Sequence, residues 1–330
     1  MPQKEIQRRT FTRTMLACAV SLAPLSQQAL AQAAPYPNRP LKIIVSFAAG
    51  GGSDVAARLL AKPLSEALGQ PVIVENKPGG DGTIAGLEVA HAPPDGHTLF
   101  LATASPITYV PSIQLTKPPY DPLKAFAPVT HFTYYTYILV VHESVPARTF
   151  NEFVAYAKAH PGKISYGAGN ATTHLALAQL EKSSNLDMTH IPYKGDSVAL
   201  PDLRAGRIQA MLVAPDAIAQ MEGRVRAIAV LGEKRSPLMP EIPTFAELGV
   251  HGVNIAPWSG IFVTGGTPAP IVERLSAELN KIFKLPEIQA QLNRAGSTLQ
   301  GSSPEYLRDL VQSQLVIWKS AVKAANIPTH

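Results

Sequence analysis

Short apolar runs alternate with amphipathic segments along the first third of the chain. Residues 41–45, 71–75 and 98–103 are rich in apolar and β-branched side chains, which is typical of buried strands. Residues 53–68 and 83–90 place apolar side chains three or four positions apart, which predicts helices. Strands and helices that alternate in this way indicate a parallel sheet covered by helices, so the predicted fold class is α/β.

The middle of the chain repeats this alternation, and the end is helical. A strand-like stretch at 129–141 follows a segment, 106–128, that contains six prolines and is expected to form a loop. Further strands and helices alternate until an apolar stretch at 255–263, after which amphipathic helices close the chain. We expect two lobes with a hinge of two chain crossings, in which 32–135 and 256–330 form lobe 1 and 136–255 form lobe 2.

Residues 1–31 resemble a cleavable export signal. Arg8, Arg9 and Arg13 precede an apolar run, and Ala29-Leu30-Ala31 offers a cleavage site of the small-x-small type. The pair Arg8-Arg9 also resembles a twin-arginine signal. We therefore expect an exported, periplasmic protein and leave the export route open.

Charge and cysteine content exclude several classes of function. The chain carries a formal net charge of +5, and the signal holds four cations and one acid, a net of +3, which leaves 5 − 3 = +2 for the mature protein. Cys18 lies within the signal, so disulfides and thiol chemistry are not expected. The mature chain has no basic run typical of nucleic-acid binding. We expect a monomer that does not bind nucleic acid, a metal or a cofactor.

Three consecutive glycines, Gly50, Gly51 and Gly52, follow the first strand and precede a helix that Ser53 or Asp54 can cap. Backbone amides at a helix start bind anions because they are unpaired and lie at the positive end of the helix dipole. A carboxylate or a phosphate fits such a loop. The alternative interpretation is a tight turn with no ligand.

A second junction of this kind occurs about 120 residues later. A short strand at 163–166 leads into a loop of small residues at 167–174, and a helix follows. If the two loops face one another, they can hold one anion between the lobes. Thr103 and Ser105 follow another strand, at the edge of the sheet where ligands of parallel sheets bind.

Several motifs occur in a fixed order along the chain: Phe47-Ala48-Ala49-Gly50-Gly51-Gly52-Ser53-Asp54, Val74-Glu75-Asn76-Lys77-Pro78-Gly79, Pro94-Asp95-Gly96-His97-Thr98-Leu99, His174-Leu175-Ala176, His190-Ile191-Pro192-Tyr193-Lys194-Gly195, Ile242-Pro243-Thr244 and Trp258-Ser259-Gly260. Together they resemble the solute-binding proteins of tripartite tricarboxylate transporters, the Bug family. The resemblance covers nearly the whole mature chain.

This resemblance implies a two-lobed periplasmic binding protein of the type II kind, and no enzyme. Such a protein closes over a small organic acid, which it holds by backbone amides of two loops, and delivers it to membrane carrier subunits. Di- and tricarboxylates, amino acids and aromatic acids remain open as ligands. Carried over to this sequence, the ligand-binding residues are Phe47, Ala48, Ala49, Gly50, Gly51, Gly52, Ser53, Asp54, Thr103, Ser105, Gly169, Asn170, Ala171, Thr172, Thr173, His174 and Asp216.

Two details of the resemblance concern individual residues. Asn170 and Ala171 stand where the family commonly has a glycine and a serine before the His-Leu pair. Asp216 would contact a ligand amine or hydroxyl, as implied by the amino-acid binders of the family.

A dinucleotide-binding periplasmic oxidoreductase is the alternative hypothesis. Gly50 and Gly52 after a strand, with Glu75 at the end of the next strand, imitate a dinucleotide-binding fingerprint. Val55 occupies the third glycine position, where it would obstruct the close contact of helix and strand. This departure argues against the alternative.

Overall fold

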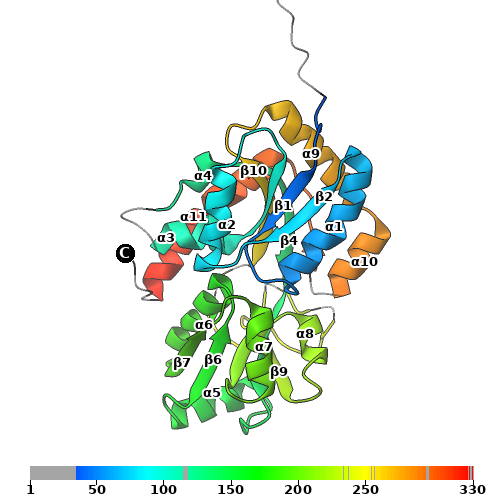
Figure 1. Ribbon diagram of the computed structural model, residues 1–330. Helices are drawn as coiled ribbons and strands as arrows, with labels where there is room; N and C mark the ends of the chain where they lie inside the picture. The colour runs from blue at the N-terminus through cyan, green and yellow to red at the C-terminus, as the bar shows by residue number, and fades with distance from the viewer. Residues whose placement is uncertain are drawn as a thin grey trace, which may run out of the picture. The chain divides into compact units, whose positions relative to one another are not determined.

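The computed structural model describes residues 35–113, 118–232, 234–236, 238–253, 255, 257–294, 297–325, 327 and 329. Two mixed β-sheets with helices on both faces organise these residues (Figure 1), which confirms the α/β fold class. The predicted signal at 1–31 lies outside the described residues. In the described part of the chain, no helix is both long and apolar enough to span a bilayer.

The first sheet has six strands in the described residues, in the order β11-β4-β10-β3-β1-β2. Strands β1, β2 and β3 are parallel, while β10 runs antiparallel to both β3 and β4. The apolar run of β1 is buried, as expected of a central parallel strand that is covered on both faces. The bounds are Leu41–Val45 for β1, Val72–Asn76 for β2, Thr98–Thr103 for β3, Phe126–Tyr135 for β4, Trp258–Thr264 for β10 and Ser297–Leu299 for β11.

Helices cover the two faces of this sheet with separate apolar clusters. One face packs against α1 (Gly52–Leu68), α9 (Ala269–Ile282) and α10 (Pro286–Arg294). The other face packs against α2, α11 and the helical turns between β3 and β4. The bounds there are Gly80–Gly82 for η1, Thr83–Ala90 for α2, Ser105–Tyr109 for η2, Val110–Ile113 for α3, Pro122–Ala125 for α4 and Pro304–Ala324 for α11.

The second sheet has five strands among the described residues, in the order β7-β6-β8-β5-β9. Its parallel strands are β7, β6 and β8, and β5 runs antiparallel to β8 and β9. One face packs against α5 and α6, and the other against α7 and α8. The bounds are Tyr137–His142 for β5, Phe150–Ala159 for α5, Ile164–Ala168 for β6, Ala171–Ser184 for α6, Met188–Pro192 for β7, Asp196–Arg204 for α7, Ala210–Val213 for β8, Pro215–Ala219 for α8 and Val225–Leu231 for β9.

The chain passes from the first sheet to the second between Tyr135 and Tyr137, and it returns between Leu231 and Trp258. The strands of the two sheets fall on either side of the lobe limits expected from the sequence. The lobe ranges themselves stay a prediction.

The proline-rich segment differs from its prediction as a loop. It contains η2, α3 and α4, and β4 already begins at Phe126. Pro106 and Pro122 lie in the first turns of η2 and α4, where a helix needs no amide donor. The hydroxyls of Thr108 and Ser112 each donate to the backbone carbonyl four residues earlier, at 2.6 Å. The prolines therefore begin short helices rather than preventing them.

Helix α6 joins the two halves of the fold. It packs on the second sheet through Leu177 and Leu180, while Ala171 and Leu175 belong to the apolar cluster around α11 and η2. The Ala171 amide also donates to the Ser105 hydroxyl at 3.2 Å, and both groups are buried. The first turn of α6 is thus part of the core beside the first sheet.

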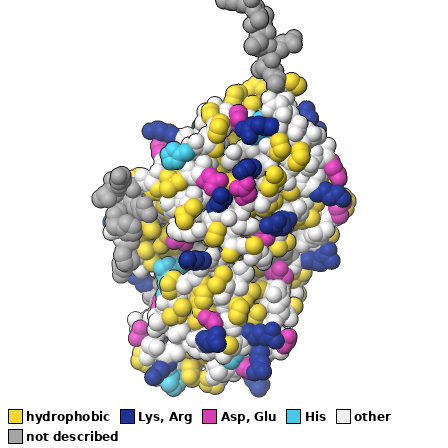
Figure 2. Space-filling model, viewed as in Figure 1, with side chains coloured by type: hydrophobic (Ala, Val, Ile, Leu, Met, Phe, Trp, Pro, Cys, Tyr) yellow, Lys and Arg dark blue, Asp and Glu magenta, His cyan; other side chains and the backbone are white. Residues whose placement is uncertain are grey.

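Several surface charges of the described residues form local ion pairs. On the face that Figure 2 shows, basic and acidic side chains are interspersed among apolar ones. Lys42 pairs with Glu75 and Arg39 with Asp95, each at 2.7 Å. Exposed pairs of this kind contribute little to stability, about 0–1 kcal/mol each.

Candidate functional site

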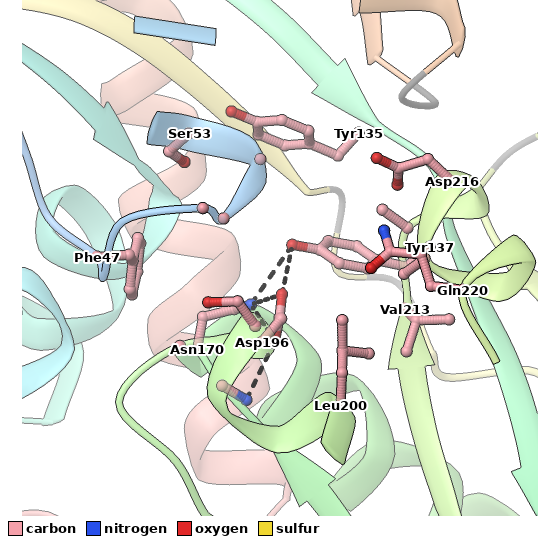
Figure 3. Close-up of a pocket in the computed structure, with 18 of the residues that line it drawn as sticks. Phe47, Ser53, Tyr135, Tyr137, Asn170, Asp196, Leu200, Val213, Asp216 and Gln220 are labelled. Atoms are coloured by element: carbon pink, nitrogen blue, oxygen red, sulfur yellow. Dashed lines mark hydrogen bonds between the residues drawn. The ribbon is translucent and has the colours of Figure 1, made fainter. Parts of the chain in front are cut away.

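A cavity of about 800 Å³ lies between the two sheets. Its walls come from the loop before α1, the crossing at Tyr135 and Tyr137, the loop before α6, and helices α7 and α8 (Figure 3). Every strand that leads into one of these loops ends at the cavity, which is the usual ligand position in such sheets. The size suits a small organic ligand.

The loop before α1 is held by side chains that lie behind it. Asp54 accepts a hydrogen bond from the Gly50 amide at 2.9 Å and forms an ion pair with Arg58 at 3.0 Å. Asn76 at the end of β2 donates to the Phe47 carbonyl at 3.0 Å and accepts from Arg58 at 3.2 Å. Gly50 has φ +79°, a backbone conformation that residues other than glycine rarely adopt.

Asp54 is therefore a support of this loop and not the cap that the sequence suggested. The N-cap position of α1 is Gly51, and no side chain caps it. Burial works against ionisation of Asp54, but hydrogen bonds from Arg58, Gly50 and Asn76 outweigh it and hold the pKa of this carboxyl below its usual value.

The start of α1 presents open amides to the cavity. The Gly50, Gly51 and Asp54 amides have acceptors within the loop. Across the described residues, no acceptor is assigned to the amides of Gly52 and Ser53, which are the first two residues of this 17-residue helix and line the cavity. Unpaired donors at the positive end of a helix dipole form an anion site.

The loop before α6 differs in part, because three of its amides already have acceptors, whereas none is assigned among the described residues to the amides of Asn170 and Thr172, which also line the cavity. The Gly169 amide donates to Asp196 at 3.2 Å, the Ala171 amide to Ser105 at 3.2 Å, and the Thr173 amide to the Asn170 side chain at 3.1 Å. Asn170 is thus the N-cap of α6. A ligand acid would have to compete with these internal acceptors.

Asp196, in the first turn of α7, is one of these acceptors and lines the cavity. Its carboxylate also accepts from the Asn170 side-chain amide at 3.0 and 3.3 Å and from the Tyr137 hydroxyl at 3.4 Å. Burial raises the pKa of Asp196 to about 6, although the three donors oppose this rise. In the described part of the chain, no basic side chain forms an ion pair with Asp196.

Asp216 in α8 is the second acidic side chain of this wall, and its carboxylate points into the cavity (Figure 3). Burial raises its pKa, and the backbone amides of Ala217 and Asp216 partly offset this. The two arginines of the lining are paired elsewhere, Arg204 with Glu222 and Arg224 with Glu143. The second-lobe wall therefore carries two carboxylates without a basic partner among the described residues.

Aromatic and apolar side chains complete the cavity. The Tyr135 hydroxyl bonds to Ser259 at 2.9 Å and to Ser53, and the Tyr137 hydroxyl points toward the loop before α1 (Figure 3). Leu200 and Val213 lie on the opposite side. Trp258 also lines the cavity, and its buried indole nitrogen has no hydrogen-bond partner among the described residues. These groups leave room for the apolar body of a ligand.

The structure brings most of the predicted site residues together. Those that line the cavity are Phe47, Ala48, Gly50, Gly51, Gly52, Ser53, Thr103, Gly169, Asn170, Thr172 and Asp216. Those that do not line it are Ala49, Asp54, Ser105, Ala171, Thr173 and His174. Asp54, Ser105 and Thr173 serve the loops from behind, as their hydrogen bonds show. His174 stacks on His190 with ring centroids 3.8 Å apart. The role of each residue in ligand binding stays a prediction.

Sequence reasoning missed Tyr135, Tyr137, Asp196 and Leu200 as lining residues. The position of the two tyrosines at the crossing between sheets was a usable signal, because residues at such a crossing lie between the lobes. Asp196 directly follows a quoted family motif, but its contact with the loop before α6 depends on tertiary structure.

Three observations bear on cofactors and metals. Glu75, the acidic residue of the fingerprint in the oxidoreductase alternative, pairs with Lys42 at 2.7 Å and Lys77 at 3.6 Å. The sequence argument against this alternative placed Val55 between helix and strand, where it would obstruct their contact. The residue is instead 50% exposed, so this reason does not hold. Within the described ranges, no group of three or more His, Cys, Asp or Glu side chains is placed to hold a metal ion.

Comparisons with known proteins agree with the geometry. The family model described as "Tripartite tricarboxylate transporter family receptor" matches residues 56–327. The UPF0065 protein in the tcbD-tcbE intergenic region of Pseudomonas sp. (strain P51) is 35% identical over 292 residues, which are 87% of this chain and 86% of that protein.

Solved structures show the same similarity. The periplasmic binding protein BugD is 32% identical with a TM-score of 0.83, and the match covers 89% of this chain and all of BugD (100%). Rpa4515 from R. palustris, solved with adipate, is 30% identical with a TM-score of 0.84, at 89% and 100% coverage. The two-lobed, type II-like fold expected from the sequence agrees with these neighbours.

Proposed function

This chain belongs to the tripartite tricarboxylate transporter receptor family, and from that premise we propose that it captures a small organic carboxylate and delivers it to a membrane carrier. It is a solute-binding receptor and not an enzyme. The dinucleotide-binding oxidoreductase alternative finds no support in the family or in the similar structures.

The open start of α1 is the observation that carries the proposal. Gly52 and Ser53 line the cavity, their amides have no acceptor among the described residues, and a carboxylate supplies one. The supports of this loop, Asp54 and Asn76, keep the donors in place before a ligand arrives. A preorganised site of this kind spends little free energy on ordering the loop.

Closure of the two lobes is the second part of the proposal. Lobe 1 comprises 32–135 and 256–330, and lobe 2 comprises 136–255. The crossings beside Tyr135 and Trp258 border the cavity, so a rotation there changes its width. Closure excludes water from the carboxylate and thereby strengthens its hydrogen bonds to the amides. Binding that favours the closed state gives the carrier a conformation to recognise.

Several finer assignments belong to the same proposal. BugD is a periplasmic binding protein and Rpa4515 was solved with adipate, which supports a periplasmic site of action and a carboxylate ligand here. We assign residues 1–31 to an export signal, with the twin-arginine route as one option, and the receptor to a monomer. Asp216 is proposed to contact a ligand amine or hydroxyl.

The test uses Gly51, which lines the cavity beside the open amides. Its backbone, at φ −80° and ψ 164°, suits any residue, and an added Cβ would meet only ordinary contacts, 3.4 Å from the Ala48 carbonyl and 4.0 Å from the Ser197 hydroxyl. Gly51→Leu should therefore fold and obstruct the anion site, while Gly51→Ala is the matched small control. Ligands come from a thermal-shift screen of mono-, di- and tricarboxylates, amino acids and aromatic acids.

The expected result is that Gly51→Leu weakens the binding of every acid found in the screen by at least about 100-fold in calorimetry, whereas Gly51→Ala changes it by less than about 10-fold. Equal affinity of Gly51→Leu and the wild type would show that the carboxylate binds elsewhere. A wild-type protein that no acid stabilises would contradict the receptor function itself.

A further inference from the structure

We propose that Asp196 selects ligands that carry one carboxylate and one protonated amine, because its side chain takes the place of a second ligand acid on the second lobe. This inference rests on the proposed function, since it concerns the same cavity. It concerns ligand class, which the family membership leaves open.

The first step concerns the donors of the second lobe. The Gly169 amide, the Asn170 side-chain amide and the Tyr137 hydroxyl all donate to the Asp196 carboxylate, at 3.0 to 3.4 Å. A ligand carboxylate at the start of α6 could use these three donors. An internal carboxylate already satisfies them, so a second ligand acid placed beside them meets a negative charge.

The second step concerns the close approach of the Asp196 segment to Gly169. A Cβ on Gly169 would lie 2.1 Å from the Asp196 backbone nitrogen and 2.4 Å from its carboxylate. Gly169 has no left-handed φ, so the close approach of the two segments is the only reason the structure gives for a glycine there. The backbone is therefore packed so that the start of α7, which carries Asp196, lies directly against the loop before α6.

The third step is the balance of charge in the cavity. Asp196 and Asp216 both line the second-lobe wall and have no ion pair within the described residues, whereas Arg204 and Arg224 are each paired with a glutamate. The opposite wall offers open amides to an anion. An acid with a protonated amine matches both walls, because its carboxylate meets the open amides and its amine meets the Asp196 carboxylate.

The groups around Asp196 agree with an unmet cation site. Tyr137 and Asn170 face it from β5 and the start of α6, and Gly169 from the loop; none of them is positively charged. Burial raises the pKa of the Asp196 carboxyl, and no positive charge among these groups opposes this rise. A ligand amine would supply the missing positive partner and lower this pKa again.

The experiment uses ligands matched in length that differ at one end only. The six-carbon set is hexanoate, adipate and 6-aminohexanoate, and the four-carbon set is butyrate, succinate and 4-aminobutyrate. Dissociation constants are measured by calorimetry for the mature wild type, Asp196→Asn and Asp196→Ala. Asp187→Asn, which removes an exposed carboxylate of the same lobe outside the cavity, is the control for net charge. Thermal melts check that each variant is folded.

In at least one set, the wild type should bind the amino acid at least about 10-fold more tightly than the dicarboxylate. Asp196→Asn or Asp196→Ala should shift this ratio at least about 10-fold toward the dicarboxylate, and Asp187→Asn should leave it unchanged. The proposal is overturned if the wild type binds the dicarboxylate at least as tightly in both sets, or if both variants change all acids equally. Binding of no acid at all would instead contradict the receptor function.

Discussion

The side-chain amide nitrogen of Asn170 lies 3.0 and 3.3 Å from the two carboxylate oxygens of Asp196. This contact joins the N-cap of α6 to the first turn of α7 and places an internal carboxylate at a helix start that could otherwise receive a ligand acid. The two amide loops of the receptor, similar in sequence pattern, are therefore unequal in chemistry, because only the one before α6 holds a carboxylate of another element.

Gly169→Ala should destabilise the protein, because the new Cβ would meet the Asp196 backbone at 2.1 Å. Overpacking of this kind costs about 1–3 kcal/mol of the free energy of unfolding. Gly52→Ala is the matched control, since nothing lies within 4 Å of its added Cβ and its conformation is helical. Urea denaturation of both variants without ligand measures the difference. Equal stability of the two would show that the segment at 195–196 moves freely.

Ser105→Ala should also destabilise the protein, because it leaves the buried amide of Ala171 without an acceptor. The cost of an unpaired buried donor is about 1–3 kcal/mol. Ser112→Ala serves as the control: Ser112 is equally buried, but its hydroxyl donates to the carbonyl of Thr108 within the same helical segment. If the two variants unfold at the same urea concentration, the bond between Ser105 and α6 contributes nothing.

The stability of the protein should depend on pH through Asp196. Burial raises the pKa of this group from 3.8 to about 6, so the folded state holds the proton more tightly than the unfolded state does. The contribution of Asp196 to stability is therefore full below pH 4 and is lost as the pH rises to about 6. Relative to the wild type, Asp196→Asn should gain up to about 3 kcal/mol between pH 4 and pH 7. Urea titrations at several pH values test this, and parallel curves would contradict the shift.

The affinity for an amino acid ligand should follow the same ionisation. Protonation of Asp196 removes the negative charge that the ligand amine is proposed to meet, so the affinity should fall as the pH drops from 7 to 5. In Asp196→Asn, this pH dependence should be weaker. Calorimetry with 6-aminohexanoate or 4-aminobutyrate gives both curves, and superposition of the two normalised curves would refute this role of Asp196.

Ligand binding should change the fluorescence of one of the two tryptophans. Trp258 lines the cavity beside a crossing between the sheets, whereas Trp318 is buried among α11, η2 and α3. A ligand titration should therefore give a signal in Trp318→Phe and none in Trp258→Phe, with binding in both confirmed by calorimetry. The reverse pattern would mean that the ligand acts on the α11 side of the molecule.

The sequence alone predicted the local parts of this structure well. The unit formed by β1, the glycine loop and α1 follows from an apolar run, three glycines and helical spacing, all within 30 residues. The site at the carboxyl ends of the strands followed from the order of elements. The proline-rich segment was predicted wrongly, because proline favours the first turn of a helix as well as a loop.

The contacts that give the site its character could not be predicted in this way. Asp196 meets Gly169 only after β6 and β7 pair and α7 returns over the sheet, and the two residues are 27 positions apart in a sequence that contains no signal of this contact. Tyr137 reaches Asp196 across 59 residues for the same reason. Such contacts depend on the register and packing of distant elements, which a local pattern does not encode.

The position of α6 limits how this receptor can open. Ala171 and Leu175 are buried beneath α11 and η2. Separating the two halves of the molecule on that side would expose both side chains to water and break the hydrogen bond between the Ala171 amide and Ser105. An opening that keeps α6 seated beneath α11 and η2 has to separate the loop before α1 from α7, where the Ser197 hydroxyl lies 4.0 Å from the position of a Cβ on Gly51. We therefore expect solute to enter on the side of α1 and α7.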